Sequence, residues 1–207
     1  MNCMFNENDI DLFYEYLNKC DCYFEYGSGG STFNSVINNN IKYVYSVESD
    51  IDWYNDITNK LLDYNYKFKY FFIDLNSEPN SYGRPGGTKA AGLQGLPSKP
   101  DNVKCTNDWK KYSDVFLNLS SCEQKNINLI LIDGRFRVAC CLKLFEYINN
   151  ETVVLFDDFK NREWFHIVLN YYEIINDKKN GNMVALKKKN VDKPNQNIIE
   201  QYEIDYR

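Results

Sequence analysis

The 207-residue sequence contains a single histidine, and this shortage limits the metal chemistry that it can support. Its seven cysteines form no CxxC pair, and the spacings CDC (Cys20, Cys22) and CC (Cys140, Cys141) are poor for zinc. We therefore expect no zinc site and reduced thiols in a cytoplasmic protein.

Long hydrophobic runs are absent as well. No apolar stretch approaches the roughly 20 residues that are needed to span a bilayer. The first residues, MNCMFNENDIDLF, lack the charged-then-apolar order of a signal peptide. We expect neither a membrane segment nor a secretion signal.

An excess of positive charge is also missing, since the net charge is -5 and neither half is strongly basic. A nucleic-acid binder normally carries a basic face that neutralises phosphates, so we expect no nucleic-acid partner. The run KKKNVDK is a local exception that is typical of a solvated strand end. With 43% hydrophobic residues, the chain suits one soluble globular domain over residues 1–207, and a second copy of the chain is a candidate partner.

Short apolar runs alternate with segments of helical periodicity along most of the chain. The runs that predict strands are 22–26, 41–48, 66–75, 127–134, 152–159 and 182–189. Helices are predicted over 9–19, from Ser31 or Thr32 onward, and over 49–65, 108–119, 135–148 and 162–175. This alternation predicts an α/β fold with a Rossmann-like, doubly wound, mostly parallel sheet of seven strands and helices on both faces.

Residues 76–108 interrupt this rhythm with four of the five prolines and five of the ten glycines. A loop of this length inside a domain is usually a functional lid or an insertion. It follows the third strand, so Tyr82 and Arg84 are predicted to reach a substrate at the same edge of the sheet.

Acidic side chains follow five of the predicted strands, at the edge where open α/β sheets bind ligands. They are Glu25, Glu48, Asp74, Asp133 and the pair Asp157 and Asp158. Behind the first strand, the run GSGGST lets backbone amides approach a ligand, because glycine has no Cβ. Glu48 follows about twenty residues later, where an acid can bind ribose hydroxyls. These features predict a nucleoside pocket.

Several segments in order resemble the class I S-adenosylmethionine-dependent methyltransferases, from about residue 20 to residue 176. The segments are YFEYGSGGSTF, YSVESDIDWYNDI, FFIDL, LILIDGRFRVACCLKLF and VVLFDDFKNREWFHIVLNYY. They look most like a bacterial and viral group of that family with a DGRFRVAC-type fourth strand. The resemblance implies that S-adenosylmethionine is the cofactor. Its contacts would be Glu25, Gly27, Ser28, Gly29 and Ser31 on the methionine side, Glu48 on the ribose, Asp74 near the adenine, and Asp133.

Asp133, Asp157 and Asp158 also resemble the metal ligands of catechol-type, cation-dependent O-methyltransferases, which implies a Mg²⁺ or Mn²⁺ site. The sequence departs from that pattern in two places. Its strand-five pair is Asp-Asp instead of Asp-Asn, and Phe136 stands where that family has a lysine base. Without a metal, one of these aspartates is the predicted base, and three close carboxylates should raise at least one pKa.

Arg135 and Arg137 flank Phe136, and they are predicted either to pair with these acids or to bind an anionic substrate. Arg135 is accordingly a predicted substrate contact. His166, the only histidine, is a further candidate base or substrate contact on the helix that follows strand five.

These features together predict an enzyme that transfers a methyl group from S-adenosylmethionine to a hydroxyl of a small polar acceptor, a sugar or glycan. Two alternatives stay open. One is an NAD-dependent oxidoreductase, which is disfavoured because Thr32 replaces the third glycine of the G-x-G-x-x-G fingerprint. The other is a methyltransferase-like binding subunit without catalysis.

Overall fold

A computed structural model describes residues 1–77, 81–85 and 107–205, so most of the predicted 76–108 loop lies outside the described residues. The strands are β1 Cys22–Tyr26, β2 Tyr43–Glu48, β3 Phe68–Phe72, β4 Leu129–Ile132, β5 Val153–Phe156, β6 Tyr172–Asp177 and β7 Val184–Lys188. The α-helices are α1 Glu7–Leu17, α2 Gly30–Ile37, α3 Ile51–Lys60, α4 Asn107–Asp114, α5 Ser121–Asn126, α6 Arg137–Leu144 and α7 Gln196–Tyr202. Short 3-10 helices are η1 Leu62–Tyr64, η3 Phe116–Asn118 and η4 Glu163–Asn170.

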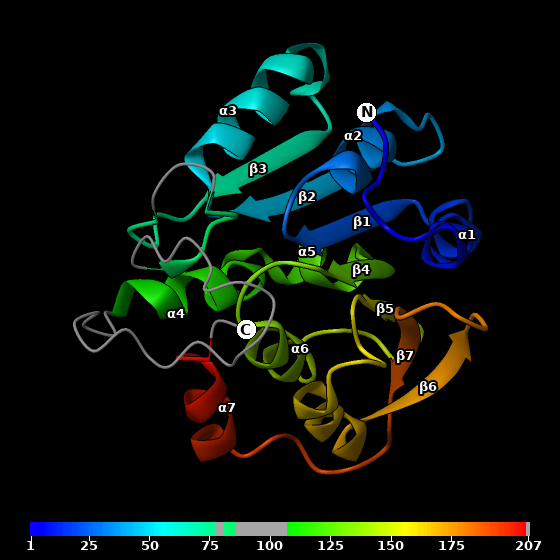
Figure 1. Cartoon of the computed structure of the whole chain (residues 1–207), viewed down its shortest axis with the longest axis vertical. Helices are drawn as coiled ribbons and strands as arrows, with labels where there is room; N and C mark the ends of the chain where they lie inside the picture. The colour runs from blue at the N-terminus through cyan, green and yellow to red at the C-terminus, as the bar shows by residue number, and fades with distance from the viewer. Residues whose placement is uncertain (78–80, 86–106, 206–207) are drawn as a thin grey trace.

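The seven strands form one sheet in the order β3-β2-β1-β4-β5-β7-β6. Figure 1 shows β3 at one edge and β6 at the other. Strands β1 to β5 pair in parallel, and β7 runs antiparallel to both β5 and β6. The predicted Rossmann-like, mostly parallel fold is confirmed.

Strand β6 corrects the prediction of a helix over 162–175. The helical part is the 3-10 helix η4, which ends at Asn170, and the next residues pair with β7 in an antiparallel register that contains a bulge. Residues 172–177 include one Tyr and two Ile, which suit a strand as well as an apolar helix face. Only pairing with β7 distinguishes the two structures.

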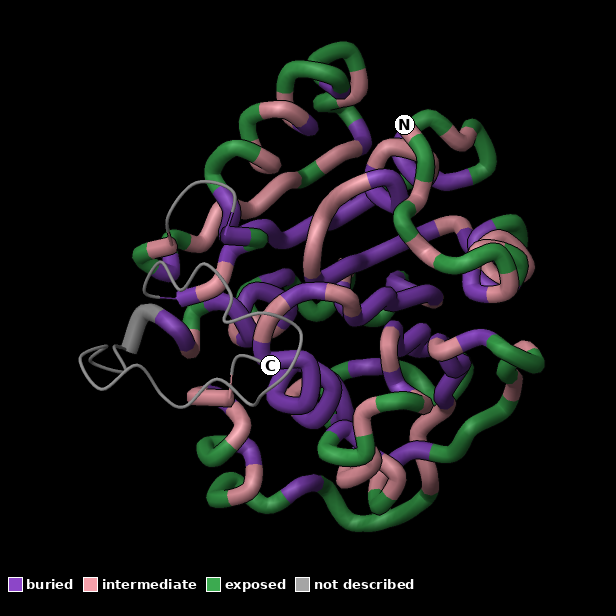
Figure 2. The backbone as a smooth tube through the Cα atoms, viewed as in Figure 1, coloured by how far each residue is buried: buried purple, intermediate pink, exposed green. Residues whose placement is uncertain are grey.

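Two hydrophobic cores lie on opposite faces of the sheet, because successive strand residues point to opposite sides. One core packs β-strand residues such as Phe24 and Ile132 against α4, α6, η4 and α7. The other packs Tyr23 and Leu131 against α1, α2 and α3. Figure 2 shows that burial is concentrated in the central strands, while the outer helices keep exposed faces. This three-layer arrangement leaves the carboxyl ends of the parallel strands at one edge.

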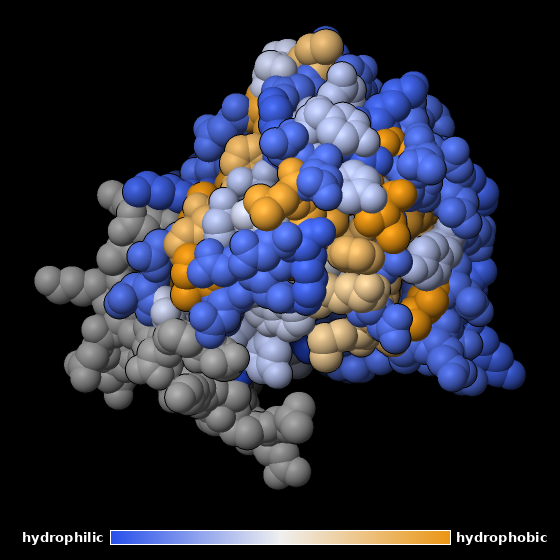
Figure 3. Space-filling view, turned by 90° about the horizontal axis from the view of Figure 1, so that it is seen from above, coloured by the Kyte–Doolittle hydropathy of each residue, from blue (hydrophilic) through white to orange (hydrophobic). Residues whose placement is uncertain are grey.

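In the view from above in Figure 3, hydrophobic residues form a broken band that hydrophilic residues interrupt. No helix within the described ranges is long and apolar enough to cross a membrane.

Candidate active site

A cavity of about 330 Å³ opens at the carboxyl ends of β1, β2, β4 and β5. The strand order reverses between β1 and β4, and ligands of open α/β sheets bind at such a switch point. A cavity of this size lies within the usual range for small-molecule sites. Its lining residues are Met4, Phe5, Gly27, Ser28, Gly29, Gly30, Ser31, Glu48, Ser49, Trp53, Tyr82, Arg84, Tyr112, Asp133, Gly134, Arg135, Arg137, Asp157 and Asp158.

At Gly27, the glycine loop packs against the loop that follows β4. Its φ is +90°, and a Cβ there would lie 2.7 Å from the backbone nitrogen of Gly134. Gly134 is equally constrained, because its Cβ would lie 1.9 Å from the Tyr112 hydroxyl. The two loops therefore meet backbone to backbone, which only glycine permits.

Gly29 differs from its neighbours because it faces open space. It is the N-cap of α2, its φ of 164° is an extended value, and a Cβ built there has no atom within 4 Å. Its backbone amide donates to the Thr32 hydroxyl over 2.8 Å, so the residue in place of the third fingerprint glycine holds the loop in shape. The glycine loop thus forms one wall of the cavity.

Glu25 lies beneath this loop and does not line the cavity, which corrects its predicted role as a cofactor contact. The Tyr23 and Ser31 hydroxyls each donate to its carboxylate over 2.8 Å, and the Thr32 hydroxyl donates to it as well. Burial raises the pKa of Glu25 to about 7, although these hydrogen bonds act in the opposite direction. Glu25 anchors the glycine loop from below.

As the pH rises from 5 to 7, we expect the free energy of unfolding of Glu25→Gln to fall less than that of wild type. The wild-type folded state keeps a proton up to its pKa of about 7, whereas the unfolded chain releases it near 4.5. Stability therefore falls as pH rises through this window, by roughly 3 kcal/mol for this group. Urea unfolding at pH 5, 6, 7 and 8 measures the difference, with the exposed Glu151→Gln as the control. Parallel pH profiles for wild type and Glu25→Gln would contradict the assignment.

Glu48 lines the cavity as predicted, and its carboxylate is already fully hydrogen-bonded. Oε1 accepts from the backbone amides of Ser49 and Asp50 over 2.6 and 2.8 Å. Oε2 accepts from the Ser28 amide and hydroxyl over 3.1 and 2.5 Å. Burial raises the pKa of this carboxyl in spite of these donors. A ligand hydroxyl would have to replace the Ser28 hydroxyl to reach Glu48.

Two predicted site residues lie elsewhere. Asp74 is exposed, and its carboxylate accepts from the Asn76 amide over 2.7 Å, so it caps a turn and does not line the cavity. The Nε2 atom of His166 lies 3.1 Å from the carbonyl oxygen of Phe159, and its ring packs against the Phe159 ring at 4.9 Å. His166 does not line the cavity either, so its place in the fold does not support a catalytic role.

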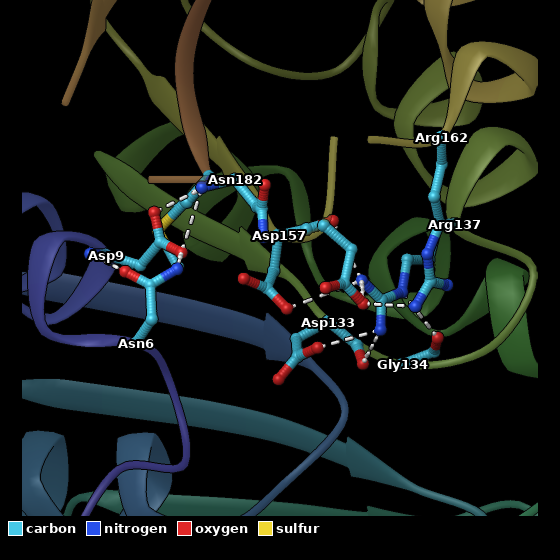
Figure 4. A network of polar contacts seen from close by, with 10 residues as sticks. Asn6, Asp9, Asp133, Gly134, Arg137, Asp157, Arg162 and Asn182 are labelled. Atoms are coloured by element: carbon cyan, nitrogen blue, oxygen red, sulfur yellow. Dashed lines mark hydrogen bonds and ion pairs between the residues drawn. The ribbon is translucent and has the colours of Figure 1, made fainter. Parts of the chain in front are cut away.

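Arg137 occupies the centre of the predicted metal-binding acids. Its guanidinium contacts Asp133 at 2.9 Å, Asp158 at 3.3 Å and Asp157 at 3.6 Å, and only 6% of its side chain is exposed. It also donates to the carbonyl oxygens of Gly134, Asp157 and Asp133. Figure 4 shows this network. Five of these contacts are hydrogen bonds, which matches the five N–H donors of a guanidinium.

The acids around Arg137 carry less negative charge than their number suggests. Burial, and then the charge of Asp133, raise the pKa of Asp157 well above its usual range, which favours the protonated form. The neighbouring Asp133 thus contributes to the raised pKa of Asp157, as predicted, but burial contributes more. Asp158 contacts Arg162 at 2.5 Å in addition to Arg137. The guanidinium groups of Arg137 and Arg162 thus face the carboxylates of Asp133 and Asp158, and the cluster is close to neutral.

The residues do not fit the predicted Mg²⁺ or Mn²⁺ site. A hard cation needs several free oxygen ligands, and the guanidinium of Arg137 already occupies the space between these carboxylates. Within residues 1–77, 81–85 and 107–205, no group of three or more Asp, Glu, His or Cys side chains has an arrangement that could hold a metal ion.

We expect wild-type protein to bind no Mn²⁺ with a dissociation constant below about 1 mM, because the internal cation competes for every carboxylate. Arg137→Met should gain Mn²⁺ binding, since it removes that cation and leaves the acids unpaired. Electron paramagnetic resonance of free Mn²⁺ measures both proteins. Saturable binding to wild type that Asp157→Asn abolishes would restore the metal site.

The predicted substrate contacts Tyr82, Arg84 and Arg135 all line the cavity. Tyr82 is 61% exposed and has a φ of +54°, so its position depends on a strained backbone. The lining also includes the large side chains of Met4, Phe5, Trp53 and Tyr112, which the sequence reasoning missed. None belongs to a strand end, and Met4 and Phe5 reach the cavity because the N-terminal segment crosses Gly30.

Comparison with known proteins identifies the fold. No protein-family model matches the chain, and no curated protein matches it. A methyltransferase-like protein from Silicibacter pomeroyi has a similar structure, with a TM-score of 0.69 and 20% identity over 100% of this chain and 98% of that chain. A putative tRNA (m1A22) methyltransferase from Streptococcus pneumoniae, solved with S-adenosyl-L-methionine, has a TM-score of 0.53 and 10% identity over 97% and 78% of the two chains.

At these identities the similarity establishes a shared fold, so the chain has the same Rossmann-like fold as these two solved structures. The narrower group with a DGRFRVAC-type strand stays a prediction.

Proposed function

We propose that the protein is an S-adenosylmethionine-dependent methyltransferase that modifies a hydroxyl group of a small polar acceptor. The observation that carries this proposal is the cavity at the switch point of a methyltransferase-like sheet. The glycine loop, Glu48 and the acids after β4 and β5 all face it.

The walls of this cavity fit the cofactor. Gly29 presents backbone without a side chain on the open side, which suits the amino-acid end of the cofactor. Glu48 lies across the cavity, where its carboxylate would hold the ribose hydroxyls once the Ser28 hydroxyl turns away. Bound there, S-adenosylmethionine would supply an electrophilic methyl group. The chain itself would position the acceptor oxygen and keep water away from it.

Asp157 is the proposed base. Asp157 has to lose its resting proton before it can act, and because its pKa is raised, the ionised form then accepts a proton more readily than an ordinary carboxylate does. Arg137 would hold this carboxyl beside Asp133 and balance the negative charge that appears when Asp157 loses its proton. Arg137 is therefore a positioning residue.

The acceptor is proposed to be a sugar or glycan hydroxyl. The net charge of -5 disfavours a long polyanion, because an acidic surface repels phosphates. The Streptococcus pneumoniae protein is described as a putative tRNA methyltransferase, so RNA belongs among the acceptors to be tested. We further propose that the protein is cytoplasmic and that it is either monomeric or paired with a second copy.

Calorimetric titration with S-adenosylhomocysteine tests the cofactor. We expect micromolar binding to wild type, and at least about tenfold weaker binding to Glu48→Gln, which removes one charged acceptor. Glu151→Gln, on an exposed side chain, should bind as wild type does. NADH in place of S-adenosylhomocysteine tests the oxidoreductase alternative. Cofactor binding without methyl transfer to any sugar, nucleotide sugar or RNA would favour the non-catalytic alternative.

A further inference from the structure

Of the four arginines in the described ranges, two have a counter-ion there and two have none there. Arg137 and Arg162 pair with the acids described above. The side chains of Arg84 and Arg135 make no ion pair or hydrogen bond with any residue in the described ranges, although both line the cavity. Unpaired cations in a partly enclosed site are costly unless a ligand pairs with them.

The backbone separates the roles of Arg135 and Arg137. Phe136 lies between them, fully buried, with a φ of +53°, a left-handed value that is rare for an aromatic residue. Its ring packs against Trp109 and Tyr112, which hold it in place. Arg137 thereby reaches the acids, and Arg135 is left at the cavity beside Tyr112, whose hydroxyl accepts from the Arg135 amide over 3.4 Å.

The backbone next to Arg84 is held by the residues before α3. The preceding residue, Gly83, has a φ of +65° and is bound to the start of α3. Its amide donates to Asp50 over 3.2 Å, and its carbonyl accepts from the Ser49 hydroxyl over 3.1 Å. The positive charge of Arg84 acts on Arg135 and contributes to lowering its pKa to about 10, after burial and Arg137. Arg135 therefore stays charged at neutral pH, and the two cations share one site.

We infer that Arg84 and Arg135 bind an anionic group, a phosphate or a carboxylate, that belongs to the methyl acceptor. The inference rests on the proposed function and narrows its substrate class to anion-bearing small molecules. The proposed cofactor has one carboxylate but two positive groups, the ammonium and the sulfonium. Its binding therefore adds net positive charge beside Arg84 and Arg135, which have no counter-ion among the described residues. An anionic acceptor removes that excess, and guanidinium forks bind such groups with two parallel hydrogen bonds.

The test titrates inorganic phosphate, pyrophosphate and acetate into protein with and without saturating S-adenosylhomocysteine, at constant ionic strength. We expect phosphate or acetate to bind wild type, and Arg84→Gln and Arg135→Gln each to weaken this binding about tenfold, as for one charge-assisted pair. Lys193→Gln, which removes an exposed surface charge, is the matched control and should bind as wild type does. Preference for phosphate or acetate identifies which anion the acceptor carries.

The S-adenosylhomocysteine affinity of the same variants separates the two sources of an anion. An unchanged cofactor affinity supports the acceptor site. A loss that parallels the loss of phosphate binding would assign the arginines to the cofactor carboxylate and overturn the inference. So would a wild type that ignores all three anions, or a short RNA that binds more than about a hundredfold tighter than phosphate with a steep salt dependence. If S-adenosylhomocysteine fails to bind wild type, the proposed function fails, and the titration without it still measures the anion site.

Discussion

Gly29→Asp is expected to abolish binding of S-adenosylhomocysteine, with an affinity loss of at least about a hundredfold, and to leave the fold intact. The backbone at Gly29 is extended, and a Cβ there meets no atom within 4 Å, so the side chain enters the cavity without strain. Its carboxylate would occupy the space that is proposed for the cofactor and would repel the cofactor carboxylate.

The same substitution should preserve or slightly raise stability, because Gly29 is the N-cap of α2 and Asp is a preferred N-cap. Calorimetry measures the affinity, and thermal unfolding measures the fold. Gly29→Asn is the matched control, since it keeps the size and removes the charge, and it should bind more tightly than Gly29→Asp. Full affinity in Gly29→Asp would show that the cofactor does not lie against this loop.

Arg137→Met is expected to destabilise the protein by about 3–5 kcal/mol at pH 7, because removing one partner leaves buried carboxylates uncompensated. The guanidinium makes five hydrogen bonds, three of them to backbone carbonyl oxygens. The loss should shrink at pH 5. Without the cation, the acids retain protons to higher pH in the folded state, so the variant loses stability as pH rises.

Urea unfolding at both pH values measures this effect. Arg137→Lys keeps the charge but offers three donors in place of five, so its stability should lie between wild type and Arg137→Met. It also provides a measurement if Arg137→Met does not fold. Equal stability of wild type and Arg137→Met at pH 7 would show that the guanidinium is not the counter-ion of these acids.

The sequence by itself determined the class of fold and the edge that carries the site. Apolar runs separated by helical segments require parallel strands, and the carboxyl ends of such strands must meet at one edge. That rule correctly placed Glu48, Asp133, Asp157 and Asp158 at one cavity. Local backbone chemistry was also readable, since the glycine-rich run predicted a close approach, and Gly27 makes one with Gly134.

The tertiary structure decided how the side chains at that edge are used. The Glu25 side chain does not face the cavity, because alternate strand residues point to opposite layers. No local pattern says which layer holds the ligand. The Asp74 carboxylate accepts a hydrogen bond within its own loop instead of lining the cavity. Residues 172–177 form a strand only because β7 lies beside them. The division between Arg137, which is buried among acids, and Arg135, which faces the cavity, depends on the left-handed backbone of Phe136. Aromatic packing from α4 holds that conformation, and such long-range contacts cannot be read from neighbouring residues.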